Sequence, residues 1–292
     1  MKTNLWIILL LFVSISSGCV RWPSEFISET PSLPSSDADR LFNRAMQLYN
    51  SADEAEKIEQ AIEAFKHVLK ADPEHYDALT FISNLYILLG DAYSIKKPEK
   101  IDHFRSALIY SELAMYTNPE FKASVDKGAP VWEAAGFLTK RELDAMFFWT
   151  TALFYYYKEG LNGLGQVIEY RWVKRAKQVL DIMTGLDPEW GGGGLYFTWG
   201  VYYLSIPESV GGDRKLSEEY FQKAIDTGPD WLLNRWGRAK YYHVKMQNPL
   251  DFKEDLQWVL KQDIKSSKGP YPWKAYFIKD AQNMLDNMDD YF

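Results

Sequence analysis

The side chains that could carry out chemistry are few and scattered along the chain. Four histidines fall on separate predicted helices or helix ends, without the spacing of metal ligands: His67, His75, His103 and His243. We interpret them as surface or helix-capping residues. Carboxylates are abundant but fall on the polar faces of predicted helices, so nothing places a nucleophile beside a base. The sequence therefore predicts no metal site and no enzyme activity.

Two glycine-rich stretches are candidates for binding phosphate or other anions. The stretch 160–165, "GLNGLG", lacks the glycine pattern and the preceding strand of a dinucleotide loop, and no phosphate loop is present, so we expect no cofactor. The run 191–194 precedes a helix predicted from about 195 to 206. Its four glycines permit positive φ angles and leave the first N–H groups of that helix uncovered: Gly191, Gly192, Gly193 and Gly194. They form either a turn or an anion site, and the sequence favours the turn.

A second glycine turn follows the same predicted helix. Gly211 and Gly212 predict a tight turn, and Asp213 is placed to cap a helix that begins near Arg214.

The N-terminus has the pattern of an exported protein. Residues 1–18 place Lys2 before an apolar run and then small residues, which is typical of a signal peptide. Cys19, the only cysteine, follows "SISSG" and resembles the lipidated cysteine of a bacterial lipobox. The alternative is a signal cut nearby that leaves an unpaired thiol. Residues 19–39 are rich in Pro and Ser and predict a flexible tether, so the folded domain should span 40–292.

Composition limits the partners. The chain has 292 residues, is 47% hydrophobic and carries a formal net charge of -7, with no basic run. This acidic balance argues against nucleic acid or anionic lipid headgroups as partners. Because there is no second cysteine, packing alone must stabilise the domain.

Apolar residues recur every three or four positions from residue 38 onward, which predicts an all-α domain. Four segments share a small residue, a bulky residue, another small or flexible residue and then Pro, a pattern that resembles the second helix of a tetratricopeptide repeat. They are Ala61, Phe65, Val68 and Pro73; Ala107, Ser111, Ala114 and Pro119; Ala176, Leu180, Met183 and Pro188; and Leu216, Tyr220, Ala224 and Pro229. Glycines at "LLGDAY", "TWGVYY" and "RWGRAKYY" mark predicted helix crossings. We therefore expect an α-α superhelix of degenerate repeats.

An extra helix predicted at about 140–158 is apolar on nearly every face, and most aromatic residues lie from here to the C-terminus. These side chains either fill a core or line a ligand cavity, because so many buried Tyr and Trp polar groups are hard to satisfy in a solid interior. If they line a cavity, we expect it near five residues: Trp149, Tyr155, Trp190, Trp199 and Tyr203.

The segment 206–260 resembles the T component of tripartite ATP-independent periplasmic (TRAP) transporters, the TatT family of helical lipoproteins. The matching features are Pro207, the turn at 211–213, the paired Tyr241 and Tyr242, and a final helix before Leu260. The resemblance implies a tetratricopeptide-like, trimeric domain with a pore or cleft. It also implies docking to a periplasmic solute-binding protein and handling of a small hydrophobic or carboxylate solute.

The leading hypothesis is therefore a lipid-anchored, periplasmic accessory protein of a solute transporter. A second hypothesis is a repeat scaffold for envelope assembly, whose interior would be filled by side chains and whose concave face would bind a peptide. A third, glycan capture on exposed aromatic rings, would need long loop insertions for which this chain has little room.

Overall fold

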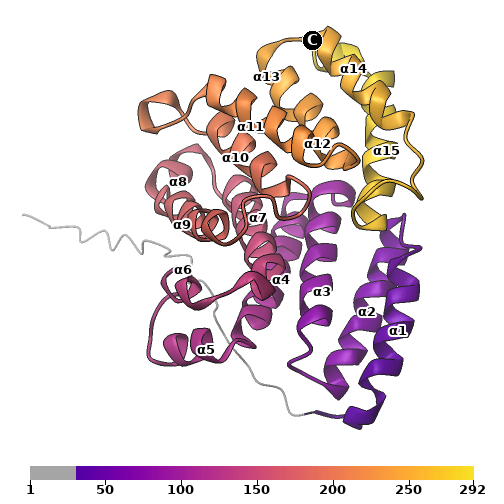
Figure 1. Ribbon diagram of the computed structural model, residues 1–292, viewed down its shortest axis with the longest axis vertical. Helices are drawn as coiled ribbons and strands as arrows, with labels where there is room; N and C mark the ends of the chain where they lie inside the picture. The colour runs from indigo at the N-terminus through magenta and orange to yellow at the C-terminus, as the bar shows by residue number, and fades with distance from the viewer. Residues whose placement is uncertain (1–30) are drawn as a thin grey trace, which may run out of the picture.

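The computed structural model describes residues 31–292, and these fold into a curved stack of helices with no β-strand beyond one isolated bridge between Trp231 and Lys268 (Figure 1). The predicted all-α class is confirmed. The longer helices are α1 (Ala38–Tyr49), α2 (Ala55–Ala71), α3 (Tyr76–Leu88), α4 (Lys97–Tyr116), α5 (Pro119–Asp126), α7 (Leu143–Gly160), α9 (Arg171–Leu186), α10 (Gly194–Ser205), α11 (Arg214–Thr227), α14 (Pro249–Leu260) and α15 (Tyr271–Asp286). Short helices α6 (Val131–Ala134), α8 (Gly163–Ile168), α12 (Leu232–Gly237) and α13 (Val244–Met246) connect them.

Neighbouring helices pack along the chain in the manner of a helical repeat, with α1 against α2, α3 against α4, and α10 against α11. The predicted second helices of the repeats are α2, α4, α9 and α11. In the first three, the pattern residues lie in the core as predicted, and all have 0% exposure: Ala61, Phe65, Val68, Ala107, Ser111, Ala114, Ala176, Leu180 and Met183.

The repeat pattern in α11 lies one residue later than the sequence indicated. Ser217 and Phe221 are buried, whereas Leu216 and Tyr220 are partly exposed. A spacing of four and then three residues keeps side chains on one face of a helix. Ser217, Phe221 and Ala224 have that spacing, whereas Leu216, Tyr220 and Ala224 do not. Ser217 donates to the carbonyl oxygen of Gly200 at 2.8 Å, which joins α11 to α10.

Glycines lie where the helices cross, as predicted. A Cβ added at Gly90 would lie 2.6 Å from the ring of Phe104, and one at Gly237 would lie 2.1 Å from the ring of Phe197. Both glycines stand at π-helical segments, Leu89–Tyr93 and Arg238–His243. Each missing side chain lets an aromatic ring of the neighbouring helix approach the backbone.

The predicted extra helix at 140–158 is α7, which follows a short 3₁₀ turn capped by Thr139. The final helix expected before Leu260 is α14, but it is not the last, because α15 follows it. Among residues 31–292, no helix combines the length and the apolar character needed to cross a bilayer. The predicted signal peptide, Cys19 and most of the tether lie outside the described residues.

The two ends of the helical stack meet. One hydrophobic core runs through α4, α7, α9 and α10, while the second is built jointly by α1–α3 and by α12, α14 and α15. In Figure 1, α15 stands against the end of the N-terminal helices. Two long-range contacts join them: Trp273 Nε1 donates to Asn84 Oδ1 at 3.1 Å, and Lys279 pairs with Glu54 at 2.9 Å. The superhelix therefore closes into a ring.

The burial pattern of α11 predicts the stability of two neighbouring variants. Phe221→Ala should lower the free energy of unfolding by about 3–5 kcal/mol, because it empties a fully buried site. Tyr220→Ala should cost about 1 kcal/mol, because that ring is partly exposed. Chemical denaturation followed by circular dichroism measures both, and equal costs would contradict the register described for α11.

Candidate functional site

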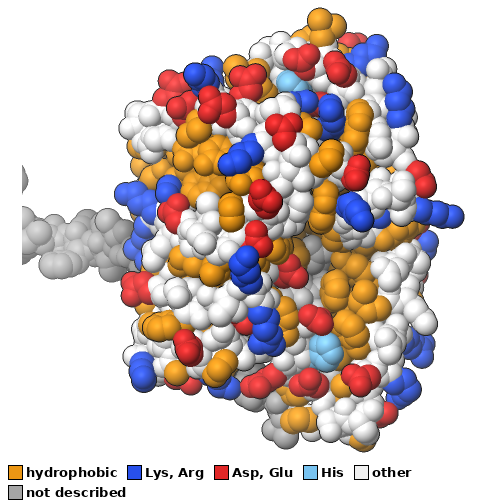
Figure 2. Space-filling model, in the orientation of Figure 1, with side chains coloured by type: hydrophobic (Ala, Val, Ile, Leu, Met, Phe, Trp, Pro, Cys, Tyr) orange, Lys and Arg blue, Asp and Glu red, His pale blue; other side chains and the backbone are white. Residues whose placement is uncertain are grey.

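The ring surrounds a cavity of about 1140 Å³ that opens to solvent. Its lining comes mainly from α3, α7, α8, α10, α12 and α15. Its lining is mainly apolar and aromatic, with Phe147, Phe148, Phe154, Phe197 and Trp231 among the rings. A concave, apolar space of this size is typical of a small-molecule site. On the face in Figure 2, hydrophobic side chains reach the surface where α15 approaches the N-terminal helices.

The structure brings two of the five predicted cavity residues to the lining. Tyr155 and Trp190 line the cavity, and Trp149, Trp199 and Tyr203 do not. Trp149 is fully buried in the core, where its indole donates to Glu112 at 2.9 Å. Tyr155 follows Trp149 by six positions, so the two side chains point about 120° apart around α7.

Trp199 and Tyr203 lie on the face of α10 that turns away from the cavity. The Trp199 indole donates to Thr184 Oγ1 at 2.9 Å, and Tyr203 stacks between Trp199 and Tyr220. The cavity face of α10 is instead built from Phe197, Thr198 and Val201. The sequence analysis did not single out these residues, although the four-residue spacing from 197 to 201 is the signal that could have found them.

Polar groups of the cavity wall gather toward opposite ends of α7. Near one end, burial and the neighbouring Asp77 raise the pKa of Asp144, while a hydrogen bond from Trp190 opposes the rise. Near the other, the hydroxyl groups of Tyr155 and Tyr241 lie 3.3 Å apart. Burial raises the pKa of both tyrosines, so their hydroxyl groups are neutral and can donate or accept hydrogen bonds.

The glycine run 191–194 forms a tight turn at the edge of the cavity. Gly191, Gly192 and Gly193 have φ angles of 66°, 59° and 87°, in the left-handed region. The N–H groups of Gly193 and Gly194 donate to the carbonyl oxygens of Glu189 and Gly191. These two donors are therefore not free for an anion.

Close packing explains why side chains are missing from this turn. A Cβ at Gly192 would lie 2.0 Å from the Trp231 indole, and one at Gly193 would lie 2.4 Å from the carbonyl oxygen of Ala224. Asn234 donates to the carbonyl oxygens of Gly192, Ala224 and residue 228 at 2.9–3.0 Å. The turn thereby fixes the start of α10 against α11 and α12.

The second glycine turn fixes the other end of α10. Gly211 has a φ of 106°, and a Cβ at Gly212 would lie 2.0 Å from the carbonyl oxygen of Ile206. Asp213 accepts a hydrogen bond from the Leu216 backbone N–H at 2.9 Å, so it caps α11, which begins at Arg214.

Comparison with known proteins identifies the family. A family model described as the TRAP transporter T-component matches residues 56–292, which is most of the chain. The chain belongs to this family. The TatT resemblance is thereby confirmed, and the chain is an accessory component of a TRAP transporter system.

A likeness to a solved structure shows the helical-repeat fold of the chain. A thermophilic TPR protein of Thermus thermophilus matches with a TM-score of 0.52 and 15% identity, over 85% of this chain and 98% of that chain. At this identity the likeness shows the fold alone, and it confirms the predicted tetratricopeptide-like architecture. A comparison with curated proteins gave no match.

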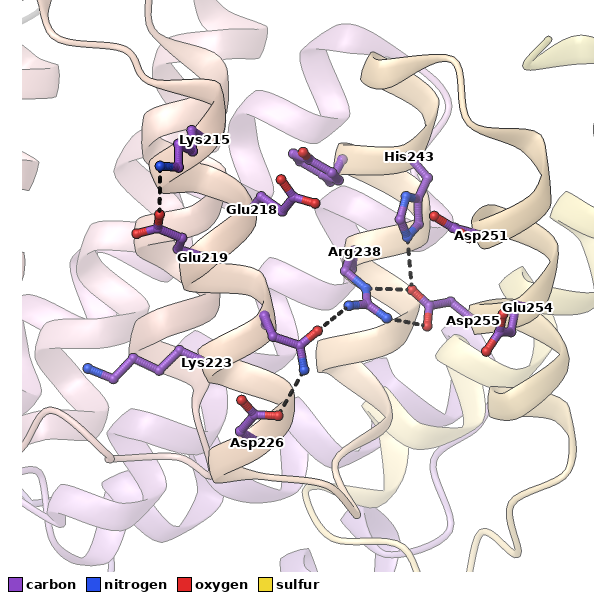
Figure 3. A pocket seen from close by; sticks show the side chains of 12 residues that line it. Lys215, Glu218, Glu219, Lys223, Asp226, Arg238, His243, Asp251, Glu254 and Asp255 are labelled. Carbon is purple, nitrogen blue, oxygen red and sulfur yellow. Dashed lines mark hydrogen bonds and ion pairs between the residues drawn. The ribbon is translucent and has the colours of Figure 1, made fainter.

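A second, charged pocket of this TatT chain lies between α11 and α14, with a volume of about 630 Å³ (Figure 3). At its base, Asp255 accepts hydrogen bonds from Arg235 at 2.8 Å, from Arg238 at 2.7 and 2.8 Å, and lies 3.2 Å from His243 Nε2. Burial alone would raise the pKa of Asp255, but hydrogen bonds from Arg238, His243 and Arg235 hold it at about 2. This is a satisfied buried ion pair, and we interpret it as structural.

The histidines divide between two roles. His75 accepts from the Ala78 N–H and caps α3, as expected of a capping residue. The expectation of a surface or capping role is wrong for His243, which is buried against Asp255. Within residues 31–292, no group of His, Cys, Asp and Glu side chains is arranged to hold a metal ion.

Exposed apolar side chains surround one mouth of the TatT cavity. Leu164, Val167 and Ile168 of α8 are 72%, 75% and 67% exposed, and Val210 is 51% exposed. Val167 and Val210 also line the cavity. We call these four residues the apolar rim. Because their exposure is costly in water, they mark a surface that a partner can cover.

The two glycine turns make a matched pair for testing how tightly α10 is fixed. Gly211→Ala should cost about 1–2 kcal/mol of unfolding free energy, because it strains a left-handed φ with no atom within 4 Å of the new Cβ. Gly193→Ala adds a clash with a backbone oxygen and should cost at least about 3 kcal/mol. Urea denaturation measures both, and a Gly193→Ala cost no larger than that of Gly211→Ala would show that the turn is loose.

Proposed function

We propose that this TatT-family chain is a non-enzymatic, lipid-anchored periplasmic protein that docks the solute-binding protein of its transporter and binds a small apolar ligand in the ring cavity. The aromatic cavity of about 1140 Å³ carries the ligand part of the proposal. A scaffold that only holds other proteins has no use for such a cavity, so the cavity favours ligand binding over the scaffold hypothesis.

The place of the cavity mouth supports the docking part of the proposal. Val167 and Val210 belong both to the cavity lining and to the exposed apolar rim. For a solute to pass between two proteins, the mouth of the cavity in one protein must lie next to the binding site of the other. A partner seated on the apolar rim would cover the mouth, remove the exposed apolar surface from water and exclude solvent from the transfer.

Lipid anchoring completes the proposal. Cys19 would carry the lipid, and residues 19–39 would tether the helical domain to the membrane. The domain would then act in the periplasm as a homotrimer, as the TatT resemblance implies.

Filling the cavity tests ligand binding. Val201 lies on the cavity face of α10, so Val201→Trp should occupy the space and weaken binding of the neutral apolar probe N-phenyl-1-naphthylamine at least tenfold. Fluorescence titration measures the affinity. Leu250→Trp is the control, because Leu250 is 79% exposed on α14 and does not line the cavity. Unchanged binding by Val201→Trp would place the probe outside the cavity.

Placing charge on the apolar rim tests docking. The double variant Leu164→Glu with Val167→Glu should weaken binding of the transporter's solute-binding protein at least tenfold, because the interface would bury two carboxylates. Surface plasmon resonance measures the affinity, and circular dichroism verifies the fold. Leu250→Glu introduces a charge at an equally exposed leucine and should leave docking unchanged. Full affinity in the double variant would move the docking surface elsewhere.

A further inference from the structure

One amide inside the cavity is held in a single orientation. Asn84 lies on α3, lines the cavity and is only 4% exposed. Its Oδ1 accepts hydrogen bonds from Trp273 Nε1 at 3.1 Å and from the Tyr49 hydroxyl at 3.5 Å. An indole N–H can only donate, so the oxygen of Asn84 must face Trp273. The amide nitrogen must therefore point the other way.

The amide nitrogen of Asn84 has no hydrogen-bond partner among residues 31–292, although nearly all of the residue is buried. Its two N–H groups are donors in a mainly apolar lining. The amide nitrogen is not among the fully buried atoms that lack a partner, so it keeps accessible surface, and Asn84 lines the cavity. A ligand oxygen that meets it there gains a hydrogen bond in apolar surroundings.

The charges of the cavity wall distinguish between a neutral and an ionised ligand oxygen. The charged residues of the lining are Asp144, Lys158, Lys268 and Lys274. Lys158 and Lys268 are exposed to solvent. The ammonium group of Lys274 donates to two backbone carbonyl oxygens in the loop before α15, at 2.7 and 2.8 Å. No lysine of the lining is therefore free inside the cavity to balance a carboxylate at Asn84, so an ionised group there would be buried without a partner.

We propose that Asn84 determines ligand specificity by donating a hydrogen bond to an uncharged carbonyl oxygen of an otherwise apolar ligand, such as an ester or amide of a fatty chain. This inference rests on the proposed ligand binding in the ring cavity. It narrows the ligand class from hydrophobic or carboxylate molecules to neutral carbonyl compounds. The aromatic walls accept the chain, and Asn84 recognises the head.

A competition experiment with three probes of matched chain length tests the proposal. Dodecane has no acceptor, methyl laurate has a neutral carbonyl, and laurate is ionised at pH 7.5. Each displaces N-phenyl-1-naphthylamine from the protein, and the displacement gives its affinity. Wild-type protein should bind methyl laurate about five- to tenfold more tightly than dodecane or laurate.

The variant Asn84→Asp removes the two N–H donors. It keeps an oxygen for Trp273 and Tyr49 to donate to, and at pH 7.5 its ionised form replaces the donors with a second acceptor and adds a negative charge. It should lose the preference for methyl laurate over dodecane, because an ionised carboxylate has no proton to donate to the ester carbonyl. Thr151→Val, which removes another polar group from the cavity lining, is the control and should keep the preference.

Each outcome has a distinct meaning. An equal loss of methyl laurate and dodecane binding in Asn84→Asp would show that Asn84 only supports the structure, which overturns the inference. Laurate binding as tightly as methyl laurate would overturn the selectivity for neutral groups. If none of the probes binds the wild-type protein, the proposed ligand-binding function fails together with the inference.

A measurement on the unaltered protein guards against a variant that does not fold. The infrared stretch of a ¹³C-labelled ester carbonyl in bound methyl laurate should lie at lower wavenumber than in an alkane solvent, which offers no donor, because the bound carbonyl accepts a hydrogen bond. A band of the bound ester at the alkane value would mean that the carbonyl meets no donor, and the role proposed for Asn84 would be wrong.

Discussion

The closure of the superhelix is the constraint on which the other features of this TatT chain depend. An open helical repeat presents a concave surface, whereas here α15 returns to the N-terminal helices and shares a hydrophobic core with them. The exposed Glu54–Lys279 pair contributes little to that closure, because surface ion pairs are worth about 0–1 kcal/mol. Burial of side chains such as Trp236 and Phe277, at about 1.5–3 kcal/mol each, contributes far more. The ring is thus held by packing, and the cavity is what packing leaves at its centre.

The cavity stays open because small and large residues are divided between different helix faces. Glycines such as Gly90 and Gly237 let neighbouring backbones come close at the crossings, where aromatic rings fill every gap. Aromatic rings line the inner faces, and the fixed turns at both ends of α10 hold that helix in place. Protein interiors resist small displacements because they are densely packed, so the outer crossings hold the inner walls apart.

Local sequence patterns predicted the helices well. They could not predict features that depend on contacts between distant parts of the chain. The spacing of Ala61, Phe65 and Val68, and the glycines at the crossings, depend on contacts between adjacent helices, so the sequence carries their signal. In α11 two adjacent registers both offer bulky residues, and only the contact of Phe221 with Gly200 decides between them. The lining of the cavity is harder to predict. The sequence analysis named Tyr155 and Trp190 correctly, but it also named Trp149, Trp199 and Tyr203, which α7 and α10 turn away from the cavity. The key contact of the cavity, between Asn84 and Trp273, joins helices at opposite ends of the chain, and no local period encodes such a closure.

The same contact connects the architecture to recognition. Trp273 belongs to α15, the helix that closes the ring, and its indole N–H sets the orientation of the Asn84 amide on α3. In an open ring Asn84 could rotate and present either its oxygen or its nitrogen to a ligand, so the site would distinguish acceptors from donors poorly. Closure therefore does more than enclose a volume. It converts a residue that can both donate and accept into a fixed donor, and the chemical preference of the cavity becomes a consequence of how the two ends of the chain meet.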